Sequence, residues 1–239
     1  MDALSTAKQT AEAVFGIPTG FMMDGATYER GGQMGFEGID FYFLGRGGVL
    51  GEVPADVVAA ALVFFEPSTV AAAWDRGRQV CGPAQAARAF AECAASWAEA
   101  HLPDGVDYER LADLERRVIA SASVAGAPLF AGWRALAEPS SPRALALHRT
   151  NVLRELRGAL HGGAVLAAGL SPLEAVMVKT PFMVGLFGWS EPHPDPTVHK
   201  EAWEQAEEGT DRAMARRFAV LAEAERDELV ALLSASRPR

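Results

Sequence analysis

The chain has 239 residues, of which 49% are hydrophobic, and this is enough apolar material for one large domain or two small ones. It carries 31 Asp and Glu residues against 22 Lys and Arg residues, a formal net charge of −9. Because a surface that binds a phosphate backbone is usually positive, this balance predicts a protein that does not bind nucleic acid.

Two further classes of protein are excluded by the cysteine count and by the apolar runs. Two cysteines are too few for a disulfide-built scaffold. The longest apolar runs, such as residues 57–65, are too short to span a bilayer. The first eight residues lack the basic and then apolar pattern of a signal peptide. We therefore expect a cytoplasmic protein that binds no membrane.

The first predicted element is a helix over residues 2–15, which Gly16 and Pro18 should stop. Residues 19–51 hold ten glycines and show poor helical periodicity. We expect loops and turns there, with one short extended piece around residues 39–44.

From Pro54 onward the pattern is helical almost to the end of the chain. In the first part, proline and small polar residues divide it into helices over residues 55–65, 68–80, 83–101, 108–124 and 129–136. The Pro- and Ser-rich segment 138–142 is the best candidate boundary. It separates an N-terminal helical region, residues 1–137 with the glycine-rich segment 19–51, from a C-terminal region, residues 142–239. We expect the two regions to form one compact unit.

The C-terminal region begins with a helix over about residues 143–170. Ser171 and Glu174 then match a capping box, which predicts a central apolar helix through Phe187. A proline-rich break over residues 188–196 is followed by a last helical region, residues 197–234, bent near Gly209. The predicted fold is mainly α, a helical bundle with an irregular glycine-rich N-terminal segment.

The stretch over residues 148–163 has the richest chemistry in the chain. At about 100° per residue its polar side chains fall on two stripes, with glycines between them. The candidate residues on these stripes are Arg154, Arg157 and His161, then His148 and Glu155, and between them Gly158 and Gly162. A core-filling helix would not carry this set of residues, and we interpret it as the wall of a site.

Each of these residue types suggests a role. His161 titrates near neutrality and is the candidate acid and base, with Glu155 as its partner. Arg154 and Arg157 are candidates to grip an anionic group of the substrate, together with His148. Gly158 and Gly162 expose backbone that a ligand or another helix approaches. The alternative for any one of these residues is an ordinary solvated helix face.

Arg46, in the glycine-rich run over residues 43–51, is a further candidate residue for binding the substrate. That run is either a backbone cradle for an anion or a tight turn with a surface arginine. It lacks a phosphate-loop or dinucleotide-binding pattern.

No motif names a cofactor, and without an HExxH or paired CxxC pattern we predict no metal centre. Phe182, Met183, Phe187 and Trp189 either line an apolar pocket or belong to the core.

Short motifs along most of the chain resemble one known family. They are Phe43-Leu44-Gly45-Arg46, Leu50-Gly51, Phe65-Glu66-Pro67, the run from Leu153 to Gly158 with His161, Ala168-Gly169-Leu170 and Leu173-Glu174-Ala175. The family is an actinobacterial group of largely uncharacterised helical proteins, often labelled helix-turn-helix.

Two features of the chain depart from that family. Its members usually read Arg-Glu-His-Arg-Gly-Asp-x-His in the central helix, whereas Leu156 and Ala159 stand here for a histidine and an acid. The winged helix-turn-helix segment of relatives is absent between Trp189 and Glu207. The two residue changes in the central helix suggest a re-purposed site.

We consider three functions. The leading hypothesis is a small-molecule pocket protein, an enzyme of bacterial specialised metabolism that acts on an anionic or polar-ended substrate by acid/base chemistry. The second is a non-catalytic ligand-sensing or transcription-regulator-like protein. The third is a structural helical bundle whose glycine stripe packs against another subunit, as in a homodimer.

Overall fold

The computed structural model describes residues 1–238, and the regular secondary structure of these residues is entirely helical. The predicted mainly α fold is therefore confirmed. The α-helices are α1 (Ala3–Met22), α2 (Gly25–Met34), α3 (Asp40–Gly47), α4 (Ala55–Ala61), α5 (Pro67–Val80), α6 (Pro83–His101), α7 (Tyr108–Ser121), α8 (Pro128–Ala135), α9 (Pro142–Ala167), α10 (Pro172–Lys179), α11 (Lys200–Phe218) and α12 (Glu223–Ala235). Three 3-10 helices join them: η1 (Gly48–Leu50), η2 (Pro181–Met183) and η3 (Pro196–His199).

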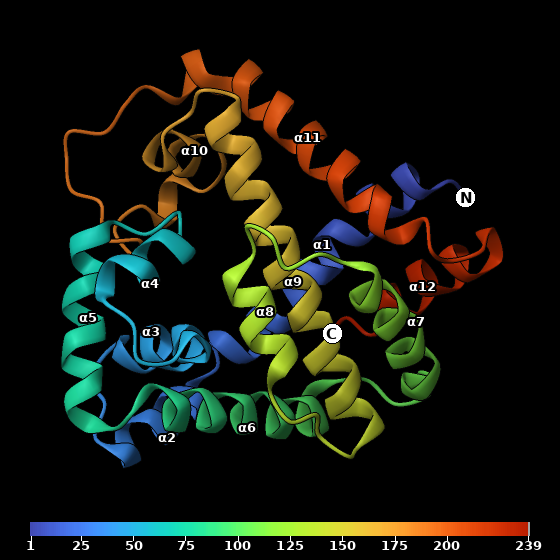
Figure 1. Ribbon diagram of the computed structural model, residues 1–239, viewed down its shortest axis with the longest axis horizontal. Helices are drawn as coiled ribbons and strands as arrows, with labels where there is room; N and C mark the ends of the chain where they lie inside the picture. Colours follow the sequence, from blue (N-terminus) through green and yellow to red (C-terminus); the bar gives the residue numbers. More distant parts are fainter. Residues whose placement is uncertain (239) are drawn as a thin grey trace.

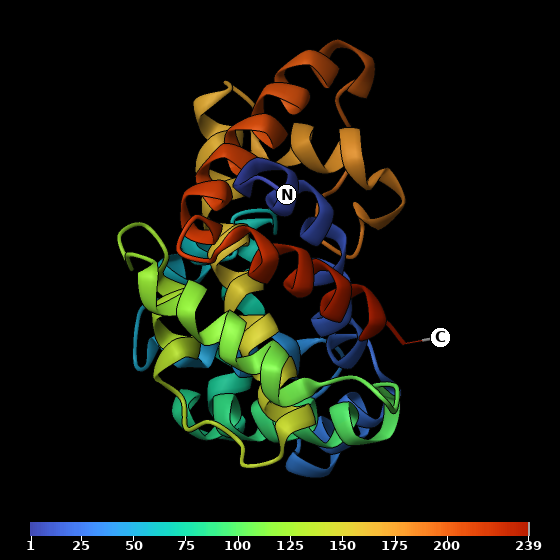
Figure 2. The same cartoon turned by 90° about the vertical axis from the view of Figure 1, so that its right-hand side faces the viewer.

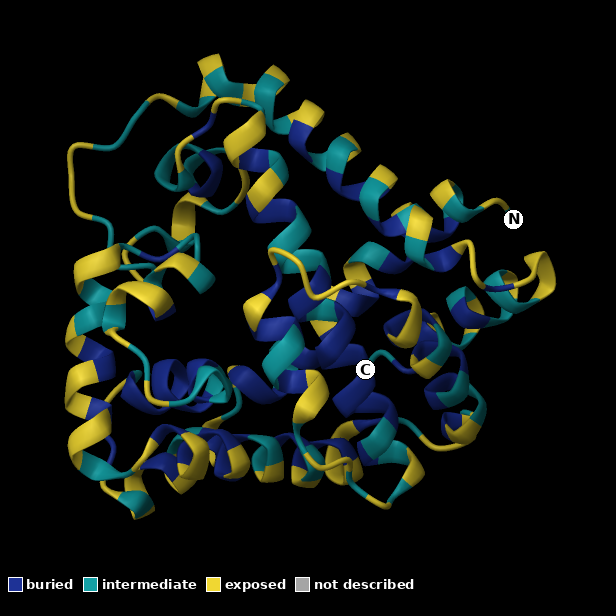
Figure 3. Cartoon of the chain, viewed as in Figure 1, coloured by how far each residue is buried: buried dark blue, intermediate teal, exposed yellow. Residues whose placement is uncertain are grey.

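Helix α9 runs through the centre of the molecule (Figure 1). Pro142 lies in its first turn, where the missing N–H of proline leaves no intrahelical bond unmade. The helix packs against α1, α6, α7, α8 and α11, and more than half of its residues are buried (Figure 3). Most of the length of α9 is therefore held by neighbouring helices, whereas its C-terminal end is partly exposed.

Helix α1 packs against the last helices of the chain as well as against α9. Its neighbours include α11 and α12, which lie beside it in both views (Figures 1 and 2). The main apolar core extends from Ala7 to Leu233 and joins helices of both predicted regions. The division into residues 1–137 and 142–239 stays a prediction.

The prediction of loops and an extended piece in the glycine-rich segment is wrong. Helix α1 continues through Pro18 to Met22, and α2 and α3 occupy most of the remainder. Some of the glycines there allow close packing: a Cβ on Gly45 would lie 2.7 Å from the Cβ of Phe90. Gly35, with φ of 102°, ends α2 in the left-handed conformation. Tertiary contacts thus offset the low helix propensity of glycine.

Two predictions for the C-terminal region are corrected in their lengths. The capping box at Ser171 is confirmed, but α10 ends at Lys179 because Pro181 disfavours the helical conformation of the residue before it. Phe182 is 83% exposed, so this segment is not a central apolar helix. The final helical region breaks at residues 219–222, whereas Gly209 lies inside α11.

No single helix within residues 1–238 combines the length and the hydropathy needed to cross a bilayer. Helices α9 and α10 pass that test only together, as a pair bent by 108°.

Candidate functional site

The larger of two cavities described here has a volume of about 620 Å³ and lies between α1, α9, α10 and the segment after α4. Six of the eight sequence-predicted site residues line it: Arg46, Arg154, Glu155, Arg157, Gly158 and His161. The helical stripes of α9 and the distant Arg46 therefore meet at one place. Their functional assignment stays a prediction.

Arg46 and Glu155 form a buried ion pair at the inner end of this cavity. The Nε and Nη2 atoms of Arg46 each lie 2.8 Å from one carboxylate oxygen of Glu155, and Nη1 donates to the hydroxyl of Tyr42 at 2.7 Å. The side chain of Glu155 is only 1% exposed. Burial by itself raises the pKa of Glu155, but the charge and hydrogen bonds of Arg46 outweigh it and hold that pKa below its ordinary value.

Arg154 shares the same carboxylate. Its Nη1 atom donates to Glu155 at 2.9 Å, and its guanidinium lies over the ring of Phe15 at 5.3 Å. Its Nε atom is buried and has no hydrogen-bond partner among the described residues. Burial, and then the positive charge of Arg46, lowers the pKa of Arg154. One buried carboxylate thus serves two buried guanidinium groups.

Arg157 and His161 have partners on α11 instead. Arg157 lies 3.0 Å from Glu207 and 3.8 Å from Asp211. The Nδ1 atom of His161 lies 3.0 Å from the hydroxyl of Thr210, which itself donates to the carbonyl of Ala206. Nδ1 therefore carries the proton, and Nε2 is the free acceptor.

The predicted pairing of His161 with Glu155 is wrong, because Glu155 belongs to Arg46 and Arg154. The ring of His161 lies between Phe64 and Trp203, with centroids 5.5 and 5.0 Å away. Burial among these groups lowers the pKa of His161 to about 4, and the charge of Glu207 only partly opposes the shift. At neutral pH this histidine is therefore uncharged, and its predicted acid and base role stays a prediction.

The ring of His161 is accordingly expected to stay neutral from pH 8 down to pH 5. Nuclear magnetic resonance titration of its ring protons checks this, and a midpoint near the ordinary 6.5 would contradict it. Because the folded pKa lies below the unfolded one, protonation favours the unfolded chain. The stability that this residue contributes is complete above pH 6.5 and is lost as the pH falls from 6.5 to about 4.

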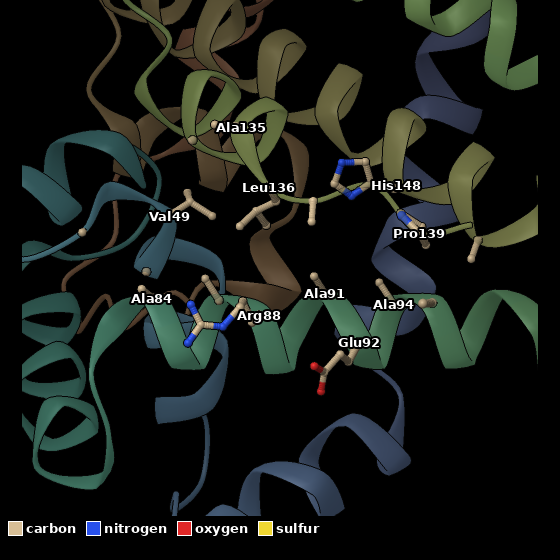
Figure 4. Close-up of a pocket in the computed structure, with 17 residues that line it drawn as sticks. Val49, Ala84, Arg88, Ala91, Glu92, Ala94, Ala135, Leu136, Pro139 and His148 are labelled. Carbon is tan, nitrogen blue, oxygen red and sulfur yellow. The ribbon is translucent and has the colours of Figure 1, made fainter. Parts of the chain in front are cut away.

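His148 and Gly162 lie outside this group. His148 lines a second cavity of about 580 Å³ between α6 and the segment that joins α8 to α9, where Ala91 and Ala94 face it (Figure 4). A Cβ on Gly162 would lie 3.0 Å from Val63 of the same chain. Gly162 therefore allows close packing within the chain. A Cβ on Gly158 would have nothing within 4 Å, and Gly158 borders the larger cavity.

Sequence reasoning missed the polar partners on α11 and the hydroxyl of Tyr42. Glu207, Thr210 and Asp211 are three and four residues apart, a spacing that places them on one helix face. This spacing was the available signal. Of the aromatic and Met residues that were candidate pocket walls, Phe182, Met183 and Phe187 line the larger cavity, whereas Trp189 donates to the carbonyl of Phe64.

No metal-binding site is formed by the free thiols of Cys81 and Cys93 or by the acidic residues of the described part of the chain. In the described part of the chain, no three His, Cys, Asp or Glu side chains gather in a metal-binding arrangement.

Comparison with known proteins gives one match. Residues 7–208 match the model of a helix-turn-helix family. No curated protein and no solved structure matches the chain.

This match overturns two predictions made from the sequence. Helix-turn-helix proteins are typically regulators that place a helix on DNA, so neither an enzyme of specialised metabolism nor a protein without a nucleic-acid partner is supported. The net charge of −9 describes the whole chain and does not exclude a local contact with DNA. Because the match covers most of its length, the chain belongs to this helix-turn-helix family.

Proposed function

We propose that this protein is a non-catalytic, transcription-regulator-like protein that binds DNA. The observation that carries the proposal is the family match over residues 7–208. A DNA-binding role agrees with the cytoplasmic location expected from the sequence.

The geometry of α9 and α10 supports this proposal. The two helices are bent by 108° and are joined by the four residues 168–171. Gly169 in that turn has φ of 82°, a left-handed conformation that favours glycine. Helix-turn-helix units join two helices at about 90–120° through a turn of three or four residues that often contains glycine. We therefore assign α9 and α10 as the candidate unit.

The cations beside α10 support a contact with phosphate groups. Lys179 ends α10, and Lys200 begins α11. His199, the neighbour of Lys200, lies 3.4 Å from Glu174 of α10, so the two segments share one surface. Both lysines are exposed, and neither has a carboxylate within 4 Å among residues 1–238. Such lysines position a protein on the DNA backbone.

We also propose that this chain is an actinobacterial member of the family that lacks the winged helix-turn-helix segment of its relatives after Trp189, so that α9 and α10 serve as the unit instead. A wing is a β-hairpin, and residues 1–238 contain no strand. Residues 188–195, where the segment would start, contain no helix. In this form of the protein, α10 and its neighbours would contact DNA without a wing.

Selection from a pool of random-sequence DNA duplexes tests the proposal. The purified protein is expected to enrich one sequence motif at low salt. The variant K179E/K200E is expected to bind the enriched duplex more weakly. The slope of the logarithm of its binding constant against the logarithm of the salt concentration should be less steep by about two.

The matched control is R30E/R88E, which makes the same charge change on α2 and α6. Figures 1 and 2 place α2 at the opposite end of the molecule from α10. This control should bind like the wild type at the enriched motif. The absence of an enriched motif, or equal losses in both variants, would overturn the assignment.

A further inference from the structure

The charges at the inner end of the larger cavity do not balance. Arg46 and Arg154 are both about nine-tenths buried, and Glu155 is the one carboxylate within 4 Å of either among the described residues. Tyr42 adds a neutral hydroxyl. A buried charge without a counter-charge is costly, and the free Nε of Arg154 adds an unmet hydrogen bond. This end of the cavity lacks one negative charge.

The third arginine at the cavity, Arg157, does not share this charge imbalance. The Nε atom of Arg157 is also buried without a hydrogen-bond partner, but its charge is matched by Glu207 at 3.0 Å, and His161 beside them is neutral. The two arginines that the sequence grouped as one clamp therefore differ. Arg154 is available for a new anionic partner, whereas Arg157 already has its own.

The walls of the cavity are apolar and soft. Aromatic rings and methionines from five segments of the chain line it: Phe15, Met22, Tyr28, Phe64, Phe182, Met183, Phe187 and Trp203. A volume of about 620 Å³ lies within the range of cavities that hold small organic molecules. A ligand that fits both the arginines at the inner end and these apolar walls has an apolar body and one anionic group.

We infer that the larger cavity binds an amphipathic organic carboxylate, with its carboxylate on Arg154 and its apolar body among the aromatic and Met side chains. No bond is made or broken in the ligand. The bound carboxylate supplies the counter-charge that Glu155 cannot give to two arginines at once, and it accepts the hydrogen bonds of the guanidinium.

This ligand would regulate DNA binding through α10. Ala175, Val176 and Lys179 of α10 form part of the cavity wall, so an occupant contacts the second helix of the candidate helix-turn-helix unit. A ligand shifts the position of that helix only by the difference in its affinity for two arrangements. This regulatory step rests on the proposed function, whereas the binding step does not.

The binding step is tested with two probes of equal chain length, dodecanoate and 1-dodecanol, by titration calorimetry on the full chain. The wild type is expected to bind dodecanoate roughly tenfold or more tightly than dodecanol, the effect of one charge-assisted hydrogen-bonded contact. In R154M the two probes should bind alike. In R154K, which keeps the charge, part of the preference should remain.

The control is R88M, which removes an exposed arginine at the rim of the second cavity and should keep the wild-type preference (Figure 4). Circular dichroism verifies that each variant is folded. A wild type without a preference for the carboxylate, or an R154M variant that keeps it, would overturn the inference; the wild-type ratio alone decides the matter if R154M does not fold.

The regulatory step is tested on the selected DNA duplex. Dodecanoate is expected to change the Kd of the wild type for this duplex by about fivefold or more and to leave R154M unchanged. Carboxylate binding without any DNA binding would reject the proposed function and keep the ligand site. DNA binding that is indifferent to the carboxylate would reject the regulatory step alone.

Discussion

The variant E155Q is expected to unfold with a free energy about 3–5 kcal/mol lower than that of the wild type. Glutamine keeps the size of the side chain but removes the negative charge that Arg46 and Arg154 share at 2.8 and 2.9 Å. Both guanidinium groups would then be buried without a counter-charge, which is the costly way to break an ion pair. Urea denaturation monitored by circular dichroism measures the loss.

The control is E52Q, which breaks the exposed pair between Glu52 and Arg78. Because water screens this pair, its loss should cost less than about 1 kcal/mol. A loss in E155Q no larger than that in E52Q would show that the buried cluster does not hold the fold. The dependence of stability on acidic pH gives a second check. The contribution of Glu155 to the free energy of unfolding is complete above the ordinary pKa of 4.5 and disappears only as the pH falls through its lowered pKa.

The variant G45A is expected to destabilise the protein by about 1–3 kcal/mol, although alanine is the better helix former. A methyl group at Gly45 would lie 2.7 Å from two carbons of Phe90. Phe90 is fully buried and packs edge-on against Phe21 and Phe41, so it has no room to retreat. Chemical denaturation of wild type and variant measures the effect.

The matched variant G32A lies on the neighbouring helix α2 and should have the opposite sign. Nothing lies within 4 Å of a Cβ at Gly32, so only the helix propensity counts. Alanine there should stabilise the protein by about 0.5–1 kcal/mol. If both variants move stability in the same direction, close packing does not explain the glycines of this segment.

These glycines mark the limit of what could be predicted of the fold. The fold class, the helix after Pro142 and the capping box at Ser171 depend on local signals, and all three are confirmed. A glycine that breaks a helix and one that admits a neighbouring ring look the same in the sequence. Only the tertiary partner, such as Phe90 for Gly45, distinguishes them.

The candidate site, too, could be predicted only in part from the sequence. Helical periodicity on α9 placed Arg154, Arg157 and His161 on one stripe, and all three border the larger cavity. Their charge partners come from elsewhere: Arg46 from α3 and Glu207 from α11. Because those partners lie far away along the chain, the spacing of residues on one helix could not show which arginine was already neutralised.

The contacts of α1 affect how the protein is made. Helix α1 packs against α9, α11 and α12, which lie far along the chain and are synthesised well after it. Until those helices emerge, the apolar faces of α1, α6, α7 and α8 that α9 covers stay open to solvent. Contacts between such distant parts of a chain form slowly, and the folding intermediates that precede them expose apolar surface and aggregate readily. The nascent chain is therefore expected to be prone to aggregation until α9, α11 and α12 have been synthesised.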